Sequence, residues 1–248
     1  MVEDYRAYYD SIASAFDRLR LDRGAEIGTT LRLIAQFVNS EDGYILDIGC
    51  GTGRYAEPLG KAGYGVLGID RSLSQLKHGP DSLPLICADA AATPFRDNLF
   101  AACLMILVIH QVTSSERKKW LEESCRILSP TGKLILKTCS HDNLRNRPFH
   151  SFFPSGLKIN LQRYPAIPEL SDQIRACGFG NIEVFPTFSE EFFNKADLLS
   201  SMRQKHNTTL ALIPLEELEK GCIEMESAFA NQDVICIPHH HTVLIAQK

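Results

Sequence analysis

The sequence predicts an α/β protein built on a doubly wound, Rossmann-like parallel sheet. Apolar segments of strand length alternate with helical segments over residues 25–140, and the links between them are short. Three of the apolar segments end in an aspartate, at Asp47, Asp70 and Asp89. Because ligands of such sheets bind at the carboxyl ends of the strands, these acids predict a small-molecule site along one edge of the sheet.

The composition indicates a globular protein with a single core. Hydrophobic residues make up 44% of the 248 residues and charged residues 23%. We expect one domain over residues 1–248, with a cap helix in residues 1–24 and a ligand-binding core at 25–140. Segments 141–166 and 189–235 then form insertions on the substrate side.

Charge and hydropathy restrict the class of partner. The formal net charge is −4, which disfavours nucleic acid. The longest apolar run, residues 101–109, is too short to cross a membrane, and residues 1–20 are too charged for a signal peptide. The eight cysteines form no CxxC pair, so we expect reduced thiols in a cytoplasmic protein. We expect a small molecule as the partner. We expect the chain to be a monomer or a homodimer.

Hydrophobic periods and end signals predict the elements of the first half in turn. Ile12, Phe16 and Leu19 recur at helical spacing before the first strand. Gly63 is placed to end the helix that follows the first strand, and Ser72 to cap the helix after the second. The predicted elements are helices at residues 4–20, 25–38, 54–61 and 72–77 and strands at 44–48, 66–69 and 85–88.

The second half continues the alternation and then changes. Residues 100–108 are apolar throughout, as in a central strand. After Cys139 the regular alternation ends, and residues 141–166 show no clean period. The predicted elements are strands at 100–108, 133–138, 182–185 and 242–246 and helices at 115–128, 169–177, 189–206 and 215–230.

Three glycines at alternate positions, Gly49, Gly51 and Gly53, follow the first strand. Glycine allows a tight turn whose backbone can touch a ligand. A dinucleotide fingerprint needs its third glycine where Arg54 stands, and no Gly-Lys-Ser/Thr sequence of a P-loop follows. Asp47, just before the turn, would repel a diphosphate and suits a ligand with an ammonium group.

The two other strand-end acids extend this interpretation. Asp70 stands where a carboxylate can accept from both hydroxyls of a ribose. Asp89 stands where a carboxylate can accept from the exocyclic amine of a purine. Ammonium, ribose and adenine without a phosphate site describe S-adenosylmethionine.

With these residues the chain resembles the class I S-adenosylmethionine-dependent methyltransferases, in particular the small-molecule group called type 11. The resemblance covers roughly residues 40–140, and the N-terminal YYDSIASAFD is similar to the lead-in helix of that family. It implies a seven-stranded sheet whose antiparallel last strand lies beside the fifth, with a helical substrate lid. The matching segments are ILDIGCGTGRYAEPL, VLGIDRS, ICADAAATPF, FAACLMILVIHQV and RILSPTGKLILKT.

The resemblance also implies a set of cofactor contacts. The methionine part would lie along the glycine turn, with Asp47 at the turn or the amino group and Tyr9 at the carboxylate. Asp70 would hold the ribose. The full set implied for the cofactor is Tyr9, Asp47, Gly49, Cys50, Gly51, Gly53, Asp70, Arg71, Asp89, Ala90, Ile106 and Leu107. One departure is Ala101, where the family usually has an aspartate of structural role.

The acceptor side is less specific. Methyl transfer needs alignment and exclusion of water, and a base only where the acceptor is protonated. His110, just past the fourth strand, is the candidate catalytic base; the alternative is a packing histidine. The candidate substrate contacts are His110, His150, Phe152, Phe153 and Tyr164. The aromatic residues either form a wall for the acceptor or seal the insertion against the sheet, and His150 is otherwise a solvated loop residue.

Two function classes stay open from the sequence. The first is methyl transfer from S-adenosylmethionine to an oxygen, nitrogen or carbon atom of a small molecule. The second is a cofactor-binding protein of the same fold with a regulatory or non-methylating role. No metal is expected, because His239 and His241 share one face of a strand without an evident third ligand.

Overall fold

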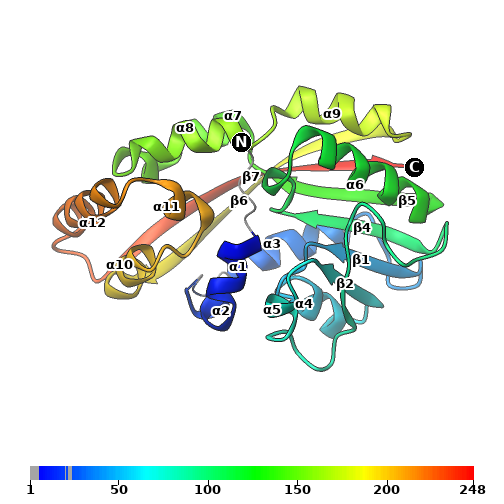
Figure 1. Ribbon diagram of the computed structural model, residues 1–248, viewed down its shortest axis with the longest axis horizontal. Coiled ribbons are helices and arrows are strands. Elements are labelled where there is room, and N and C mark those ends of the chain that lie inside the picture. Colours follow the sequence, from blue (N-terminus) through cyan, green and yellow to red (C-terminus); the bar gives the residue numbers. More distant parts are fainter. Residues whose placement is uncertain (1–5, 20, 22–23) are drawn as a thin grey trace.

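The computed structural model describes residues 6–19, 21 and 24–248, and Figure 1 shows a central sheet with helices on both of its faces. The seven strands lie in the order β3-β2-β1-β4-β5-β7-β6. The first five are parallel, and β7 pairs antiparallel with both β5 and β6. The strands are β1 (Tyr44–Ile48), β2 (Val66–Asp70), β3 (Leu85–Cys87), β4 (Phe100–Ile106), β5 (Leu128–Thr138), β6 (Gly180–Asn194) and β7 (Val234–Gln247).

The described helices fall into three groups in Figure 1: those on the sheet faces, those at the N-terminus and those of the lid. The sheet helices are α3 (Gly24–Ile34), α4 (Ala56–Lys61), α5 (Leu73–Leu76), α6 (Ser114–Ile127) and α9 (Ile167–Ala176). The N-terminal helices are α1 (Arg6–Ile12), η1 (Ala13–Ala15) and α2 (Phe16–Leu19), and η2 (Ile109–Gln111) follows β4. The lid helices are α7 (His141–Arg145), η3 (Pro148–Ser151), α8 (Pro154–Arg163), α10 (Lys195–Arg203), α11 (Thr208–Leu212) and α12 (Leu215–Ala228).

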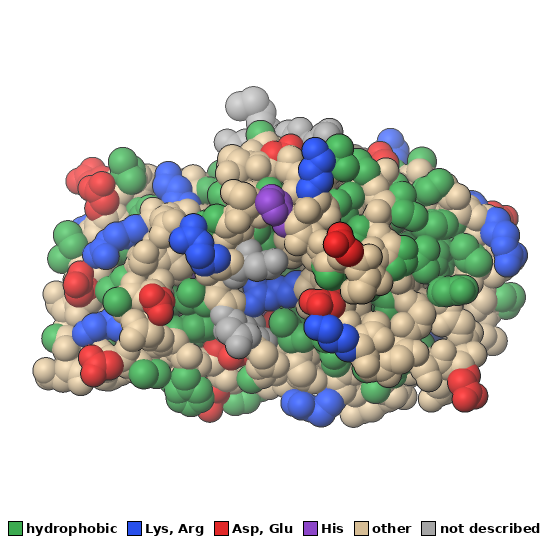
Figure 2. All heavy atoms as spheres, turned by 90° about the horizontal axis from the view of Figure 1, so that it is seen from below, with side chains coloured by type: hydrophobic (Ala, Val, Ile, Leu, Met, Phe, Trp, Pro, Cys, Tyr) green, Lys and Arg blue, Asp and Glu red, His purple; other side chains and the backbone are tan. Residues whose placement is uncertain are grey.

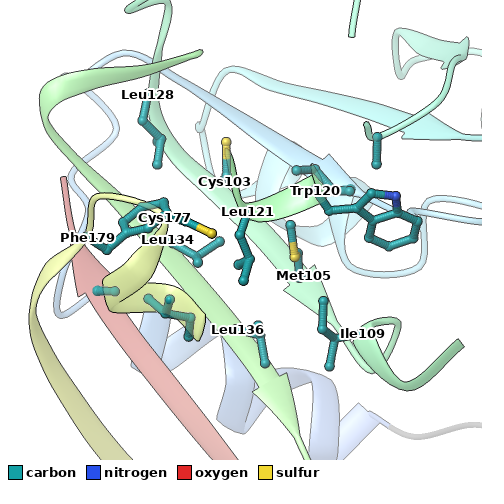
Figure 3. Packing of buried hydrophobic residues seen from close by; sticks show 14 of the residues in the cluster. Cys103, Met105, Ile109, Trp120, Leu121, Leu128, Leu134, Leu136, Cys177 and Phe179 are labelled. Carbon is teal, nitrogen blue, oxygen red and sulfur yellow. The ribbon is translucent and has the colours of Figure 1, made fainter. Parts of the chain in front are cut away.

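Alternating side chains of the strands supply two separate cores. Ile45 packs with α3 and α4 on one face, whereas Leu46 packs with α6 and α9 on the other. Figure 3 shows the second core, where Leu121 of α6 points at Cys103 and Met105 of β4. These fully or largely buried clusters hold the strand ends in fixed positions, so the site at the sheet edge rests on a rigid base.

The predicted parallel sheet and its antiparallel last strand are confirmed. Helices after the first, second and fourth strands form as predicted within about two residues. Ser72 caps α5 by accepting from the Gln75 amide, and Thr113 starts α6 with a capping box to Glu116. Gly63 has a φ of +91° just after α4, as a helix-ending glycine requires.

The N-terminal helix predicted at 4–20 is wrong as a single helix. Its described part is three short helical pieces, with a 3₁₀ turn at Ala13–Ala15 between α1 and α2. Residues 4, 5 and 20 of that predicted helix lie outside the described residues, as do residues 1–5, 20, 22 and 23 of the predicted cap segment 1–24. α1 and the 3₁₀ turn pack against α5, and Figure 1 shows α1 and α2 between α5 and the lid helix α10.

The largest difference from the sequence prediction is the length of the last two strands. Strands were predicted at 182–185 and 242–246, but β6 runs over 15 residues and β7 over 14, paired along their length. Residues 189–194, predicted as helix, therefore belong to β6. The outer half of this antiparallel pair extends beyond the sheet and carries the lid helices (Figure 1).

Residues 141–166 also differ from their predicted irregular form. They contain α7, which Ser140 caps with a capping box to Asn143, and α8, whose first residue is Pro154. Proline is favoured in the first turn of a helix, which explains how the Pro154 sequence starts one. With α10 and α12, α8 surrounds a third core that includes Phe153, Met202 and Cys222.

A buried ion pair ties the sheet to α3 and to the lid strands. Lys137 of β5 bonds Glu26 and donates to Thr30 Oγ1 at 2.6 Å. Tyr55 donates to the second Glu26 oxygen at 2.7 Å, and Glu191 of β6 accepts from the Glu26 amide at 2.8 Å. The cluster joins α3, β5 and β6 with Tyr55, the residue before α4, so it couples the sheet to the root of the lid.

Three further sequence predictions can be compared with the described residues. All eight cysteines are free thiols, and five of them are buried. Among the described residues no helix is long and apolar enough to span a membrane. The rings of His239 and His241 stack on one face of β7 with centroids 6.0 Å apart, as their alternate positions predicted.

Candidate active site

The glycine turn after β1 forms the floor of the candidate site. Gly49, Gly51 and Gly53 have φ values of +73°, +56° and +83°, which L side chains rarely adopt. The amides of Gly49 and Cys50 both donate to the Ile69 carbonyl, at 2.8 and 3.0 Å. The turn is therefore held against the end of β2. In this position the backbone of the turn faces the carboxyl edge of the sheet.

Asp70 at the end of β2 holds two turns at once. One carboxylate oxygen accepts from the Gly51 amide at 2.9 Å, and the other accepts from the Ser72 amide at 2.8 Å. Burial raises the pKa of Asp70, and the bonds to Ser72 and Gly51 oppose that rise. Each carboxylate oxygen can accept more than one bond, so these contacts leave Asp70 able to accept from a ligand as well.

Asp47 is a buried carboxylate beside Asp70. It is only 2% exposed, and its Oδ2 has no hydrogen-bond partner among the described residues. Burial, with a smaller contribution from the Asp70 charge, raises the pKa of Asp47 to about 7. Two carboxylates in one cavity wall form a strongly anionic site, which a cationic ligand would neutralise.

A cavity of about 120 Å³ lies over the turn and the strand-end acids. It brings together eleven of the twelve residues that the resemblance assigned to the cofactor. They are Tyr9, Asp47, Gly49, Cys50, Gly51, Asp70, Arg71, Asp89, Ala90, Ile106 and Leu107. Gly53 is the exception: a Cβ there would be 3.0 Å from Leu83, so this glycine serves the turn and the packing below it. We call this space the donor cavity.

A second cavity, of about 190 Å³, lies under the lid, and we call it the acceptor cavity. Aromatic and apolar side chains of the lid form most of its wall, including Phe149, Phe152 and Phe229. The polar residues in the wall include Arg147, Asn160 and several histidines. None of the lining residues that the structure describes is an aspartate or a glutamate.

Leu107 lies between the two cavities and lines both. It follows β4 and has a φ of +53°, which is uncommon for a residue with a branched side chain. Its amide donates to the Lys137 carbonyl at 2.9 Å, which holds this conformation against β5. Such strained positions persist where the surroundings fix them, often at functional sites.

His110 lies in the wall of the acceptor cavity and is 7% exposed. Its ring stacks on Tyr164, with centroids 4.0 Å apart and an interplanar angle of 10°. Its Nε2 lies 2.9 Å from Nε2 of Gln111, a residue of the donor cavity wall. The two neighbours on η2 therefore face different cavities.

The predicted substrate residues separate into two groups in the structure. His110, Phe152 and Tyr164 line the acceptor cavity, whereas His150 and Phe153 are not among its lining residues. Phe153 is fully buried in the lid core. His150 is buried rather than solvated, and burial together with Arg147 lowers its pKa to about 4.

Sequence reasoning missed several wall residues. Gln111 and Tyr55 line the donor cavity, and Met202 and His206 of the lid line the acceptor cavity. Gln111 follows the carboxyl end of β4 closely in the sequence, and this position could have predicted that it lies at the site. The lid residues have no comparable signal, because they come together only through the folding of distant helices.

The comparisons with known proteins agree with this arrangement. A family model described as a methyltransferase domain matches residues 46–136, the segment from β1 to β5. A demethylmenaquinone methyltransferase of Renibacterium salmoninarum is 33% identical over 175 residues, which are 68% of this chain and 70% of that protein. The chain belongs to the class I S-adenosylmethionine-dependent methyltransferases.

The name of another relative of this methyltransferase gives a different acceptor. A tRNA (carboxymethyluridine(34)-5-O)-methyltransferase of Arabidopsis thaliana is 27% identical over 181 residues, 72% of this chain and 43% of that protein. A structure described as a putative methyltransferase from an antibiotic biosynthesis pathway of Anabaena variabilis has a TM-score of 0.71 at 18% identity. The match covers 92% of this chain and 99% of that one, and shows a common fold.

The methyltransferase is therefore an enzyme that uses S-adenosylmethionine as its cofactor. The wall of the donor cavity fits that molecule, because the positive ammonium group of the cofactor would give the buried Asp47 Oδ2 the partner that it lacks among the described residues. On the face in Figure 2, acidic and basic side chains are interspersed.

Proposed function

We propose that this methyltransferase methylates a small planar acceptor that carries an aromatic hydroxyl group, at that oxygen or at a ring carbon activated by it. The observation that carries the proposal is the composition of the acceptor cavity. Phe149, Phe152 and Phe229 offer ring faces, and Arg147 provides a fixed positive charge. Histidine donors and acceptors complete the polar part of the wall at His110, His206, His239 and His241.

The same wall disfavours an amine acceptor that carries a positive charge. Buried cations need a carboxylate or an aromatic cage to offset their loss of water. The described wall of the acceptor cavity has aromatic rings but offers no carboxylate, and the positive charge of Arg147 in the same wall would repel a cation held by those rings. A neutral or anionic ring fits this wall better.

The name of one relative supports the same class of acceptor. Demethylmenaquinone, the acceptor in the name of the Renibacterium salmoninarum relative, is a quinone whose reduced form has aromatic hydroxyl groups. The match covers 68% of this chain, so the likeness supports the ring chemistry and not a particular side chain of the substrate.

The residues of the donor cavity have distinct roles in this proposal. Asp47 faces the ammonium group, Asp70 the ribose, and Asp89 and Ala90 the adenine, while the Tyr9 hydroxyl faces the carboxylate. When bound, S-adenosylmethionine supplies a methyl group on a positively charged sulfur. The protein aligns the acceptor with it at Leu107 and keeps water out.

Two measurements test the proposal. Calorimetry with S-adenosylmethionine and S-adenosylhomocysteine measures binding in the wild type and in Asp70→Ala, where we expect a loss of ~1–3 kcal/mol in affinity. A methyl-transfer assay then compares reduced naphthoquinones and phenols with primary amines and tRNA, and mass spectrometry identifies the methylated atom. Turnover of amines or tRNA without turnover of phenols would contradict the proposed acceptor.

A further inference from the structure

The side chain of Gln111 connects the donor cavity, the acceptor cavity and the lid. Its Nε2 donates to the Tyr9 hydroxyl at 2.7 Å and lies 2.9 Å from His110 Nε2. Its Oε1 accepts from Arg163 Nη2 at 2.9 Å. The same Arg163 nitrogen donates to Thr208 Oγ1 of α11 at 2.8 Å, so the arginine also holds two lid helices together.

The direction of these bonds follows from the chemistry of arginine. A guanidinium group donates hydrogen bonds and accepts none, so the Gln111 atom that faces Arg163 must be the amide oxygen. The amide NH₂ then faces His110 and Tyr9, and its two hydrogens match the two atoms it meets. Arg163 therefore determines which end of the Gln111 amide carries the oxygen and which carries the nitrogen.

An NH₂ group that donates to His110 Nε2 requires a lone pair on that nitrogen. The imidazole is then neutral with its proton on Nδ1, since a neutral ring carries one N–H. Stacking on Tyr164 holds the ring plane, so the tautomer and the orientation of His110 are both defined.

We propose that Gln111 is a positioning residue that holds His110 in the Nδ1-protonated form, and that His110 donates a hydrogen bond to the acceptor oxygen instead of removing its proton. The proposal rests on the hydroxylated acceptor proposed above. Gln111 acts through His110 and Tyr9, which it holds on the acceptor and donor sides, respectively.

The consequence concerns the state in which the acceptor reacts. A donor at His110 stabilises an oxygen that is already anionic, and the cationic Arg147 in the same wall has the same effect. The hydroxyl proton leaves to solvent before transfer. The acceptor then forms its bond to the methyl carbon while the carbon–sulfur bond breaks and leaves its electron pair on sulfur. Where a ring carbon attacks, that carbon afterwards loses its hydrogen as a proton to solvent, which restores the aromatic ring. Acidic phenols should therefore react faster than weakly acidic ones at neutral pH.

The groups around His110 agree with a neutral ring. Gln111 and Tyr164 contact the ring directly, and Arg163 of α8 reaches it through Gln111. Arg147, which precedes η3, lines the same cavity. Both arginines are positive, so they oppose a second proton on the imidazole, and no described residue of this wall supplies a carboxylate to favour one.

Nitrogen NMR of the histidine rings tests the tautomer in the protein without acceptor. The His110 signals are those that the His110→Asn variant lacks, and we expect the pattern of a neutral ring with its proton on Nδ1. In Gln111→Glu the carboxylate can only accept, so we expect a proton at His110 Nε2. Gln204→Glu at the exposed residue that follows α10 adds the same charge and should leave the pattern unchanged.

Kinetics distinguish a donor from a base. The asparagine of His110→Asn can donate a hydrogen bond but cannot accept a proton at neutral pH, so we expect it to retain activity within ~10-fold, against a loss of ~10²-fold in His110→Ala. Equal losses in both variants, or a wild-type ring with its proton on Nε2, would overturn the proposal. The cofactor binding and acceptor panel described above are unaffected by either result, so the two proposals fail separately.

Discussion

At the scale of single residues, the Asp47 carboxyl is the most informative group of the site. It is buried at the base of the donor cavity, and burial beside Asp70 raises its pKa to about 7. A carboxyl with this pKa is partly protonated at neutral pH in the protein without ligand. A bound cation favours its charged form, so binding and deprotonation are coupled.

We expect the affinity for S-adenosylmethionine to increase as the pH rises from 6 to 8. Below about pH 7 Asp47 carries a proton that binding of the ammonium group must expel, whereas above it the carboxylate is already charged. Calorimetry in buffers of different ionisation enthalpy measures the proton released at pH 6.5. An affinity independent of pH, with no proton release, would show that Asp47 does not face the cation.

Asp47→Asn provides the matched variant for that experiment. It should bind the cofactor more weakly at pH 8 and show no proton release. Because the folded-state pKa of Asp47 is raised, its stability contribution is present below the unfolded value of 3.8 and is lost as the pH rises through about 7. We therefore expect the variant without ligand to gain ~1–3 kcal/mol in the free energy of unfolding at pH 8. Urea denaturation measures it.

The sequence predicted the donor side at this scale because its residues follow strand ends. Asp47, Asp70 and Asp89 stand where chain direction and sheet order place them together, whatever the lid does. His150 and Phe153 show the limit of that reasoning. Their positions depend on the lid core, where a long-range partner such as Gly221 decides what is buried.

At the scale of elements, the glycine turn contains two glycines with different neighbours. A Cβ on Gly49 would be 2.5 Å from Val108 Cγ2, whereas a Cβ on Gly51 would have nothing closer than Gln75 Oε1 at 3.8 Å. Both residues have positive φ, so both substitutions carry backbone strain. Both glycines line the donor cavity, and the difference between them is that an added Cβ meets the Val108 side chain at Gly49 and open space at Gly51.

We expect Gly49→Ala to lose ~2–4 kcal/mol of unfolding free energy, since strain and overpacking act together. Gly51→Ala should lose only ~1 kcal/mol of stability but a larger part of its cofactor affinity. Thermal unfolding and calorimetry on both variants check this pairing. Equal stability losses, or unchanged affinity in Gly51→Ala, would contradict the placement of the turn.

The lid helix α12 offers a second test at this scale. A Cβ on Gly221 would be 2.5 Å from the Phe152 carbonyl oxygen and from the Phe153 ring, so Gly221→Ala should push α12 away from η3. We expect ~1–3 kcal/mol of destabilisation and a loss of methyl transfer with cofactor affinity retained. Gly180→Ala, where an added Cβ has nothing within 4 Å, is the control. A loss of cofactor affinity in Gly221→Ala would contradict this prediction, because it would show that a change in the lid also disturbs the donor cavity at the sheet edge.

The lengths of β6 and β7 mark where element prediction failed. The strand pairs form by contacts between residues far apart in sequence, such as Phe192 with Cys236. Local composition at 189–194 does not contain that information, because Ser, Glu and Phe occur in both helices and strands. By contrast, β4 was predicted nearly to its ends, since its unbroken apolar run needs no partner to be recognised.

At the scale of the whole molecule, the buried pair of Lys137 and Glu26 joins the sheet, α3 and the lid strands. Lys137→Met would leave the Glu26 carboxylate buried without its partner, which we expect to cost ~3–5 kcal/mol. The double variant with Glu26→Gln should recover part of this loss, because no charge then stays buried. Urea denaturation of the three proteins measures the difference. A double variant as unstable as the single one would contradict the coupling.

The doubly wound class of the sheet was predictable because strands and helices alternate over residues 25–140. The pairing of β7 with β5 placed the C-terminal strand inside the sheet, as the family resemblance implied. What was not predictable is how the remaining chain covers the sheet edge. That arrangement depends on the third core, whose members come from η3, α10, α11, α12 and the ends of β6 and β7.

The unbroken course of β6 and β7 has a consequence for engineering new acceptor preferences. β6 begins in the sheet and ends in the lid, whereas the antiparallel β7 begins in the lid and ends in the sheet. Since their pairing continues from Glu183 and Ile245 to Asn194 and Val234, there is no linker at which a lid from another enzyme can be grafted. A chimera joined between sheet and lid would cut two strands of one ladder. Changing selectivity therefore means exchanging individual side chains on the outer ribbon and its helices, while the backbone frame is kept whole.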